Sequence, residues 1–221
     1  MLEEERGITG INLEFLSRLK VEKNVWKIDA EGMPYRDLNS LLKAISRNGA
    51  ERIEVHNVCG QRYIGTDLDA AVQIDIYGTP GNDLGAFMNG PKIVVHGNAQ
   101  DGCGNTMNEG QIIVHGNVAD ITGYSMRGGK IFIRDNAGYR VGIHMKEFQN
   151  KKPHLVIGGT AQDFLGEYIA SGVILILGLG LQEGALCKAR FVGTGMHGGV
   201  IYERGNILEV GKETRVMKVG K

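Results

Sequence analysis

A repeat of about 19 residues runs through most of this chain and limits what it can fold into. Short β-type segments start at intervals of 21, 19, 19, 19, 24 and 19 residues, each time at isoleucine or leucine. The starts are Ile53, Ile74, Ile93, Ile112, Ile131, Leu155 and Ile174. A glycine recurs about 11 residues after each start, at Gly65, Gly85, Gly104, Gly123, Gly142 and Gly166, and later at Gly193. Two markers that keep one register over about 140 residues predict units that stack into a solenoid.

The length of the repeat predicts the type of solenoid. A unit of about 19 residues is too long for one strand and turn, and too short for a strand with a full helix. Three strands of about four residues with three glycine-containing turns would fill it. Glycine makes up 34 of 221 residues, about twice the usual share of roughly 7%. The uneven spacing disfavours a strict hexapeptide solenoid, which is left-handed. We therefore predict an all-β fold, a single-stranded right-handed parallel β-helix of about seven coils.

Two columns of the repeat predict ladders of stacked side chains. The first column lies three residues after the repeat glycine and is apolar, with flexible methionine filling gaps. Its members are Leu68, Met88, Met107, Met126, Met145, Ile169 and Met196. The second column lies five residues after the strand start and holds Asn98, Asn117 and Asn136. Stacked asparagine side chains can hydrogen-bond along the stack.

The two ends do not repeat. We expect residues 1–50 to form a helical cap, residues 51–210 the β-helix and residues 211–221 a polar, loosely held tail. Apolar spacing predicts a helix from Asp37 to Arg47 with a stop at Gly49, and a second helix from Asn12 to Lys20. A cap is needed because an open end of a solenoid exposes a sheet edge and an apolar cross-section.

Two further columns carry residues of types that can bind metals or act in catalysis. His56, His96 and His115 share a column, so neighbouring imidazoles could hold a metal with a third ligand. Tyr77 and Arg134 occupy the same column, which favours an outward, solvated position. Asp101, Asp120 and Asp163 precede the repeat glycine by three residues. Paired acids serve glycan-cleaving enzymes, but aspartate before a turn glycine is also common turn chemistry. We assign no catalytic, cofactor-binding or metal-binding residue.

Charge and composition exclude several classes of protein. The 25 basic and 25 acidic residues balance, which argues against nucleic acid or an anionic membrane as partner. No apolar run approaches the roughly 20 residues of a membrane helix. The start, MLEEERGITG, has no apolar core, so we expect no secretory signal. The 3 cysteines form no Cys-x-x-Cys pattern, and we expect a cytoplasmic protein.

The repeats also resemble a known family. The stretch NAQDGCGNTMNEGQIIVHGNVADITGYSMRGGKIFI is similar to the GXGXG repeat family, whose best-known member is the C-terminal domain of the glutamate synthase large (α) subunit. GNDLGAFMNG, TAQDFLGEYIASGVILILGL and VGTGMHGGVIY look like that domain, and VCGQRYIGT resembles its free-standing form. The similarity covers about residues 50 to 205. A subunit of formylmethanofuran dehydrogenase shares the repeat.

The resemblance implies a right-handed β-helix and a structural role in a split glutamate synthase. Such an enzyme makes glutamate from glutamine and 2-oxoglutarate with FMN and iron–sulfur clusters. In that family the amidotransferase cysteine, the FMN site and the cluster ligands lie in other domains. We therefore expect amidotransferase and FMN-containing synthase chains as partners, and no cofactor on this chain. The alternatives are the equivalent subunit of a formylmethanofuran dehydrogenase-like complex and a stand-alone β-helix hydrolase. Whether the chain also forms homo-oligomers stays open.

Two irregular coils interrupt the repeat. The stretch HMKEFQNKKP adds five residues to one coil, and Gln182 to Arg190 lengthens a later one. Insertions in a solenoid project from one face, often the binding face. We therefore expect Lys146, Phe148 and Lys151 to dock a partner, with a tolerated surface loop as the alternative.

Overall fold

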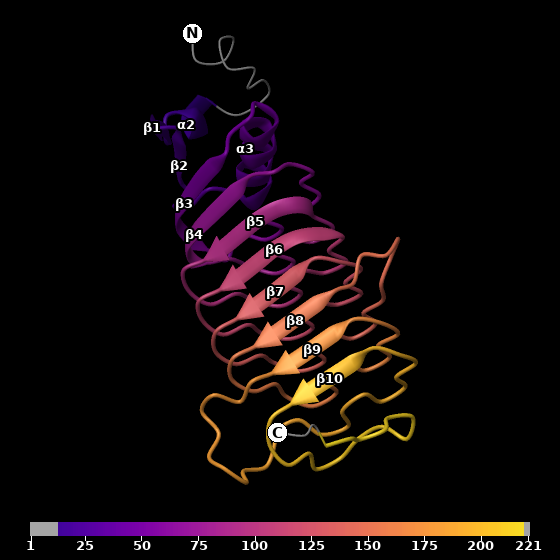
Figure 1. Ribbon diagram of the computed structural model, residues 1–221. Coiled ribbons are helices and arrows are strands. Elements are labelled where there is room, and N and C mark those ends of the chain that lie inside the picture. Colours follow the sequence, from indigo (N-terminus) through magenta and orange to yellow (C-terminus); the bar gives the residue numbers. More distant parts are fainter. Residues whose placement is uncertain (1–12, 219–221) are drawn as a thin grey trace.

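The protein is a parallel β-helix, seen in a computed structural model that describes residues 13–218 (Figure 1). Eight strands, one per coil, pair in parallel and in sequence order. They are β3 (Arg52–Cys59), β4 (Gln73–Thr79), β5 (Asn89–Val95), β6 (Glu109–Val114), β7 (Lys130–Ile133), β8 (His154–Ile157), β9 (Val173–Ile176) and β10 (Val200–Glu203). All seven expected starts stack in register, and Ile201 continues the column. The all-β class and the coil period are confirmed.

The expectation of three strands per coil was wrong. Within the described residues each coil has one regular strand, and the remaining walls are turns joined by isolated bridges such as Ala99 to Val118. The reason lies in the glycine-centred segment. Each coil there contains three residues with positive φ at alternating positions, for example Ile121, Gly123 and Ser125 at 50°, 72° and 50°. That backbone cannot form a strand, because β conformations need negative φ.

The glycine-centred segments of successive coils stack into what we call the turn wall. Their backbone amides and carbonyls form hydrogen bonds between coils without a β ladder. The amide of Gly123 donates to the carbonyl of Cys103 in the preceding coil at 2.7 Å. The amides of Ile121 and Ser125 donate the other way, to the following coil, both at 2.9 Å. Every repeat from Gly85 to Gly166 shows the same alternation. Coils are thus hydrogen-bonded on this wall as well as in the sheet, as buried backbone requires.

The central glycine of each turn wall is required by space as well as by conformation. A Cβ on Gly104 would lie 2.3 Å from Cδ1 of Ile131, a strand residue in the core. At Gly65, Gly85, Gly123, Gly142 and Gly166 the nearest strand δ-methyl would lie at 2.5 to 2.8 Å. Positive φ also disfavours any side chain there. Most outer positions of the triplets hold residues other than glycine, such as Phe87 and Ser125, and the exceptions are Gly102 and Gly195.

The two ladder columns lie where the repeat places them. Met88, Met107, Met126 and Met145 have no exposed surface, Leu68 and Ile169 are buried beside them, and Met196 packs at the partly covered last coil. In the other column, Asn98 Oδ1 accepts from the amide of Asn117 at 2.8 Å. Asn117 Oδ1 accepts from the amide of Asn136 at 3.1 Å, and Asn136 Oδ1 from that of Thr160 at 3.0 Å. The asparagines thus bond mainly to the backbone of the next coil.

The N-terminal end differs from the expectation in one element. Helix α3 (Tyr35–Arg47) closes the end of the solenoid with Leu38, Leu41, Leu42 and Ile45 buried, and Gly49 follows it with φ of 79°. The predicted second helix is only α2 (Leu13–Leu16), and Asn12 lies outside the described residues. The chain continues as an antiparallel hairpin of β1 (Leu19–Glu22) and β2 (Val25–Asp29). Pairing of β2 with β3 outweighs the short helical apolar pattern.

The C-terminal segment adds to the last coil. The amide of Gly211 donates to Val192 at 2.8 Å, and the Thr214 hydroxyl donates to the carbonyl of Gly193 at 2.9 Å. Residues 211–214 of the expected tail therefore hydrogen-bond to the solenoid. No helix in the described part of the chain is long and apolar enough to cross a membrane.

The central glycine leads to a test of packing. Gly104→Ala should destabilise the protein by roughly 1–2 kcal/mol through its left-handed backbone and by about 1–3 kcal/mol more through overpacking. Ile131→Val removes the clashing Cδ1, so the double variant should lose less stability than the two single variants added together. Urea unfolding measures all three free energies. Gly180→Ala is the control, since no atom lies within 4 Å of its Cβ position. Strict additivity would contradict the contact.

Candidate functional site

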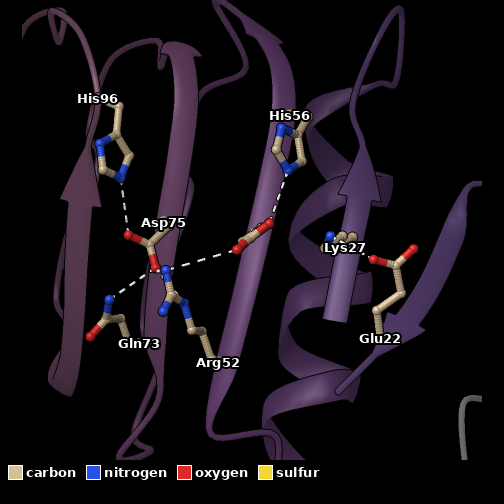
Figure 2. Close-up of polar contacts among 8 residues, drawn as sticks. Glu22, Lys27, Arg52, His56, Gln73, Asp75 and His96 are labelled. Carbon is tan, nitrogen blue, oxygen red and sulfur yellow. Dashed lines mark hydrogen bonds and ion pairs between the residues drawn. The ribbon is translucent and has the colours of Figure 1, made fainter. Parts of the chain in front are cut away.

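A network of polar side chains covers the outer face of the sheet across β2 to β5 (Figure 2). Asp75 lies at its centre and is only 2% exposed. Its carboxylate accepts hydrogen bonds from Gln73 Nε2 at 2.9 Å and His96 Nε2 at 3.0 Å. Arg52 Nε lies 3.0 Å from the same carboxylate. Since these groups come from β3, β4 and the end of β5, one buried acid connects three coils.

The electrostatics keep Asp75 ionised. Burial acts to raise its pKa, but the hydrogen bonds from His96 and Gln73 and the charge of Arg52 outweigh burial and lower it. Beside it, Glu54 pairs with His56 Nε2 at 3.2 Å and with Arg52 at 3.8 Å. In the hairpin, Lys27 Nζ lies 2.7 Å from Glu22, which lowers the pKa of that carboxyl.

Aromatic rings form a stack along the same face. His56, Tyr77, His96 and His115 follow one another with centroids 4.6, 4.5 and 5.6 Å apart and interplanar angles of 2°, 6° and 15°. Metal binding needs ring nitrogens about 2.0–2.1 Å from a single ion, and rings stacked face to face do not converge in that way. Within residues 13–218, no group of three or more His, Cys, Asp or Glu side chains could hold a metal ion.

The polar network around Asp75 joins neighbouring strands but lacks the arrangement that catalysis by its histidines would need. An imidazole bonded to a carboxylate can act as a base when a nucleophile lies within reach. In the described part of the chain, no serine, threonine or cysteine hydrogen-bonds to His96 or His56. Cys103 is buried, and burial raises its pKa to about 12. Burial and the neighbouring Glu203 likewise raise the pKa of Cys187 to about 12, so both thiols stay protonated at neutral pH.

The aspartate column also holds coils together. Asp101 Oδ1 accepts from the backbone amide of Asp120 at 3.0 Å, and Asp120 Oδ1 from that of Tyr139 at 2.9 Å. Asp163 Oδ1 accepts from the amide of Arg190 at 2.9 Å. Each carboxylate therefore acts in place of a backbone carbonyl as the acceptor for an amide of the next coil, as aspartate side chains do in turns.

The inserted loop lies back over earlier coils. The loop rises at the edge of the solenoid in Figure 1, where the strands begin. Lys151 Nζ pairs with Glu109 at 2.5 Å, and the Phe148 ring lies 5.9 Å from the Arg127 guanidinium carbon and is half exposed. Lys146 is exposed. A groove of about 320 Å³ separates Phe148 from Phe87 and Asp69. Docking by this loop stays a prediction.

Sequence reasoning missed Asp75 and the pairing around it. The available signal was a charged residue inside the apolar strand IDIYG, with Gln73 beside it and Arg52 at the neighbouring position of the preceding coil. Strand register places Arg52 opposite Gln73, next to Asp75. His96 is not the register partner of Asp75, which pairs with Val94, so the repeat spacing does not predict their hydrogen bond.

The pairing predicts a pH dependence. The pKa of Asp75 in the folded protein lies below its ordinary value of 3.8, so its contribution to stability is full above that pH and is lost as pH falls through the folded value. Asp75→Asn should lower the free energy of unfolding at neutral pH by roughly 1.5–3 kcal/mol. The difference from wild type should shrink below about pH 4. Urea unfolding across pH measures it, and Asp135→Asn, which loses an exposed pair with Arg134, is the control. A difference that grows on acidification would contradict the assignment.

Comparison with known proteins places the chain in a family. A family model described as the GXGXG motif matches residues 38–217. A protein of Methanocaldococcus jannaschii, described only as uncharacterized, is 54% identical over 185 residues, which are 81% of this chain and 71% of that protein. The family match begins within helix α3 and covers the glycine-centred turn walls and strands β3 to β10. The chain therefore belongs to the GXGXG motif family, the family of the C-terminal domain of the glutamate synthase large subunit.

Proposed function

We propose that this chain is a non-catalytic structural subunit of a split glutamate synthase. It would brace the amidotransferase chain against the FMN-containing synthase chain, with FMN and iron–sulfur clusters bound by those partners. One observation carries the non-catalytic part of the proposal. The three acids best suited to chemistry, Asp101, Asp120 and Asp163, all accept hydrogen bonds from the backbone of the next coil.

The shape of the fold supports a bracing role. Eight parallel strands about 4.8 Å apart give a rod roughly 34 Å long. Coils are bonded to each other through the sheet, the turn wall, the asparagine column and the aspartate column. A body with this many bonds between neighbouring coils can hold two partners at a fixed separation without a mobile loop.

Co-purification from the native source tests the role. A tagged chain should recover an amidotransferase chain and an FMN-containing chain in fixed proportion. Removal of the chain should lower glutamine-dependent glutamate formation while each partner keeps its own partial reaction, since a brace affects coupling between sites. Recovery of pterin-containing dehydrogenase chains would favour the formylmethanofuran dehydrogenase-like complex. Glycan cleavage by the isolated chain would contradict both assignments.

The cofactor assignment has a separate test. The chain purified alone should be colourless, with no stoichiometric flavin or iron, because we place both in partner chains. Absorbance spectroscopy and iron analysis of the isolated protein and of the complex make the comparison. A yellow or brown isolated chain would contradict this assignment even if the complex were a glutamate synthase.

A further inference from the structure

The outer face of the sheet changes character along the solenoid. One outward column runs through its centre, and in β3 and β4 it holds Glu54 and Asp75. From β5 onward every member is apolar or aromatic. These residues stack in register and are Val94, Ile113, Phe132, Val156, Leu175 and Tyr202. We call them the apolar strip.

The apolar strip departs from what a sheet with one solvated face requires. Residues on either side of it in each strand, such as Ile131 and Ile133 around Phe132, already fill the core. Outward positions of such a sheet are normally polar. Val94 is buried, Tyr202 is exposed, and the four members between them are partly exposed. Five strands about 4.8 Å apart extend the accessible part of the strip over roughly 19 Å, and contiguous apolar surface of this kind marks interaction sites. In Figure 1 no segment passes over β5 to β10.

The edges of the apolar strip are basic. Lys92 and Lys130 lie on one side and are exposed, and no ion pair joins either of them to an acid within residues 13–218. His115 lies on the other side, followed by Arg134, whose guanidinium is paired with Asp135 at 2.8 Å. The neighbouring Glu109 is paired with Lys151. Within residues 13–218, the two carboxylates beside the strip, Asp135 and Glu109, are thus paired with other cations and not with the two lysines.

We propose that the apolar strip is the docking surface for a partner protein whose contact surface is apolar at its centre and carries carboxylates at its edge. Charge complementarity identifies this occupant. A second copy of the chain would bring lysine-edged strips together, and like charges in contact oppose association. The inference goes beyond the proposed function, because it assigns a surface and a partner chemistry whichever complex the chain belongs to.

Substitutions on the strip test the proposal. The partner chains that co-purify with the tagged wild-type chain are released with high salt and rebound to immobilised variants. Phe132→Lys should reduce their recovery at least tenfold, because it places a charge in the apolar centre. The double variant Lys92→Glu with Lys130→Glu should also weaken binding and reduce its salt dependence. Tyr139→Lys is the matched control, since Tyr139 is a 48% exposed aromatic residue off this face.

Stability and cross-linking separate docking from folding. The melting temperatures of the isolated variants should stay near that of wild type, because the changed side chains lie outside the core. A carbodiimide, which joins amines to carboxylates without a spacer, should link Lys92 and Lys130 to aspartate or glutamate of a partner chain in the wild-type complex. Lys212, in the C-terminal segment, should stay unlinked.

Three results would overturn the proposal. One is partner recovery by Phe132→Lys equal to that of wild type. Another is a wild-type dimer in sedimentation that Phe132→Lys dissociates, which would mean that a second copy covers the strip. The third is a wild-type chain that retains no partner at all. Failure of the proposed function is distinct from these, because it is read from the identity of the recovered chains and not from the effect of the variants.

Discussion

The contact between the central glycine of each turn wall and a strand side chain sets the cross-section of the solenoid. At Gly104 any side chain would enter the space of the Ile131 δ-methyl group, and the same contact recurs with Ile93, Ile112, Leu155, Ile174 and Ile201. Each glycine faces the strand residue of a later coil, so the interaction joins opposite walls as well as successive coils. A larger residue would push the wall away from the sheet and open the core, whose packing leaves no room for such a change.

The same glycines explain why the opposite wall is hydrogen-bonded without being a sheet. Alternating positive φ turns successive amides toward the preceding and the following coil, as at Ile121, Gly123 and Ser125. Outer positions of the triplet can hold residues such as Phe87, although a left-handed backbone costs about 1–2 kcal/mol per non-glycine residue. The polar columns then add cross-coil bonds from Asn117 and Asp120. The apolar strip on the outer face of β5 to β10 contributes none of these polar bonds between coils.

Sequence periodicity was sufficient to predict the fold class and the columns, because residues one repeat apart in the sequence lie side by side in adjacent coils. Met107 and Met126 could be placed together for that reason, and so could Asn98 and Asn117. Local backbone conformation was not accessible in the same way. Nothing in the residue types at Ile121 or Phe87 signals positive φ, so the turn wall was taken for strands. The hairpin of β1 and β2 depends on pairing with β3, which a local apolar pattern in residues 12–20 does not encode.

The outer sheet face was missed for a related reason. Outward and inward positions alternate within each strand, but Val94, Ile113 and Phe132 read as part of continuous apolar runs, so the sequence does not separate core from surface there. Amide hydrogen exchange on the isolated chain tests the account most directly, because the turn wall is its central element. We predict that the amides of Gly85, Gly104, Gly123 and Gly142 exchange as slowly as those of the strand residues Ile112 and Ile131, since all are hydrogen-bonded between coils. Exchange of these glycine amides at the rate of exposed loops would contradict the structure of the wall and the rigidity that we assign to the rod.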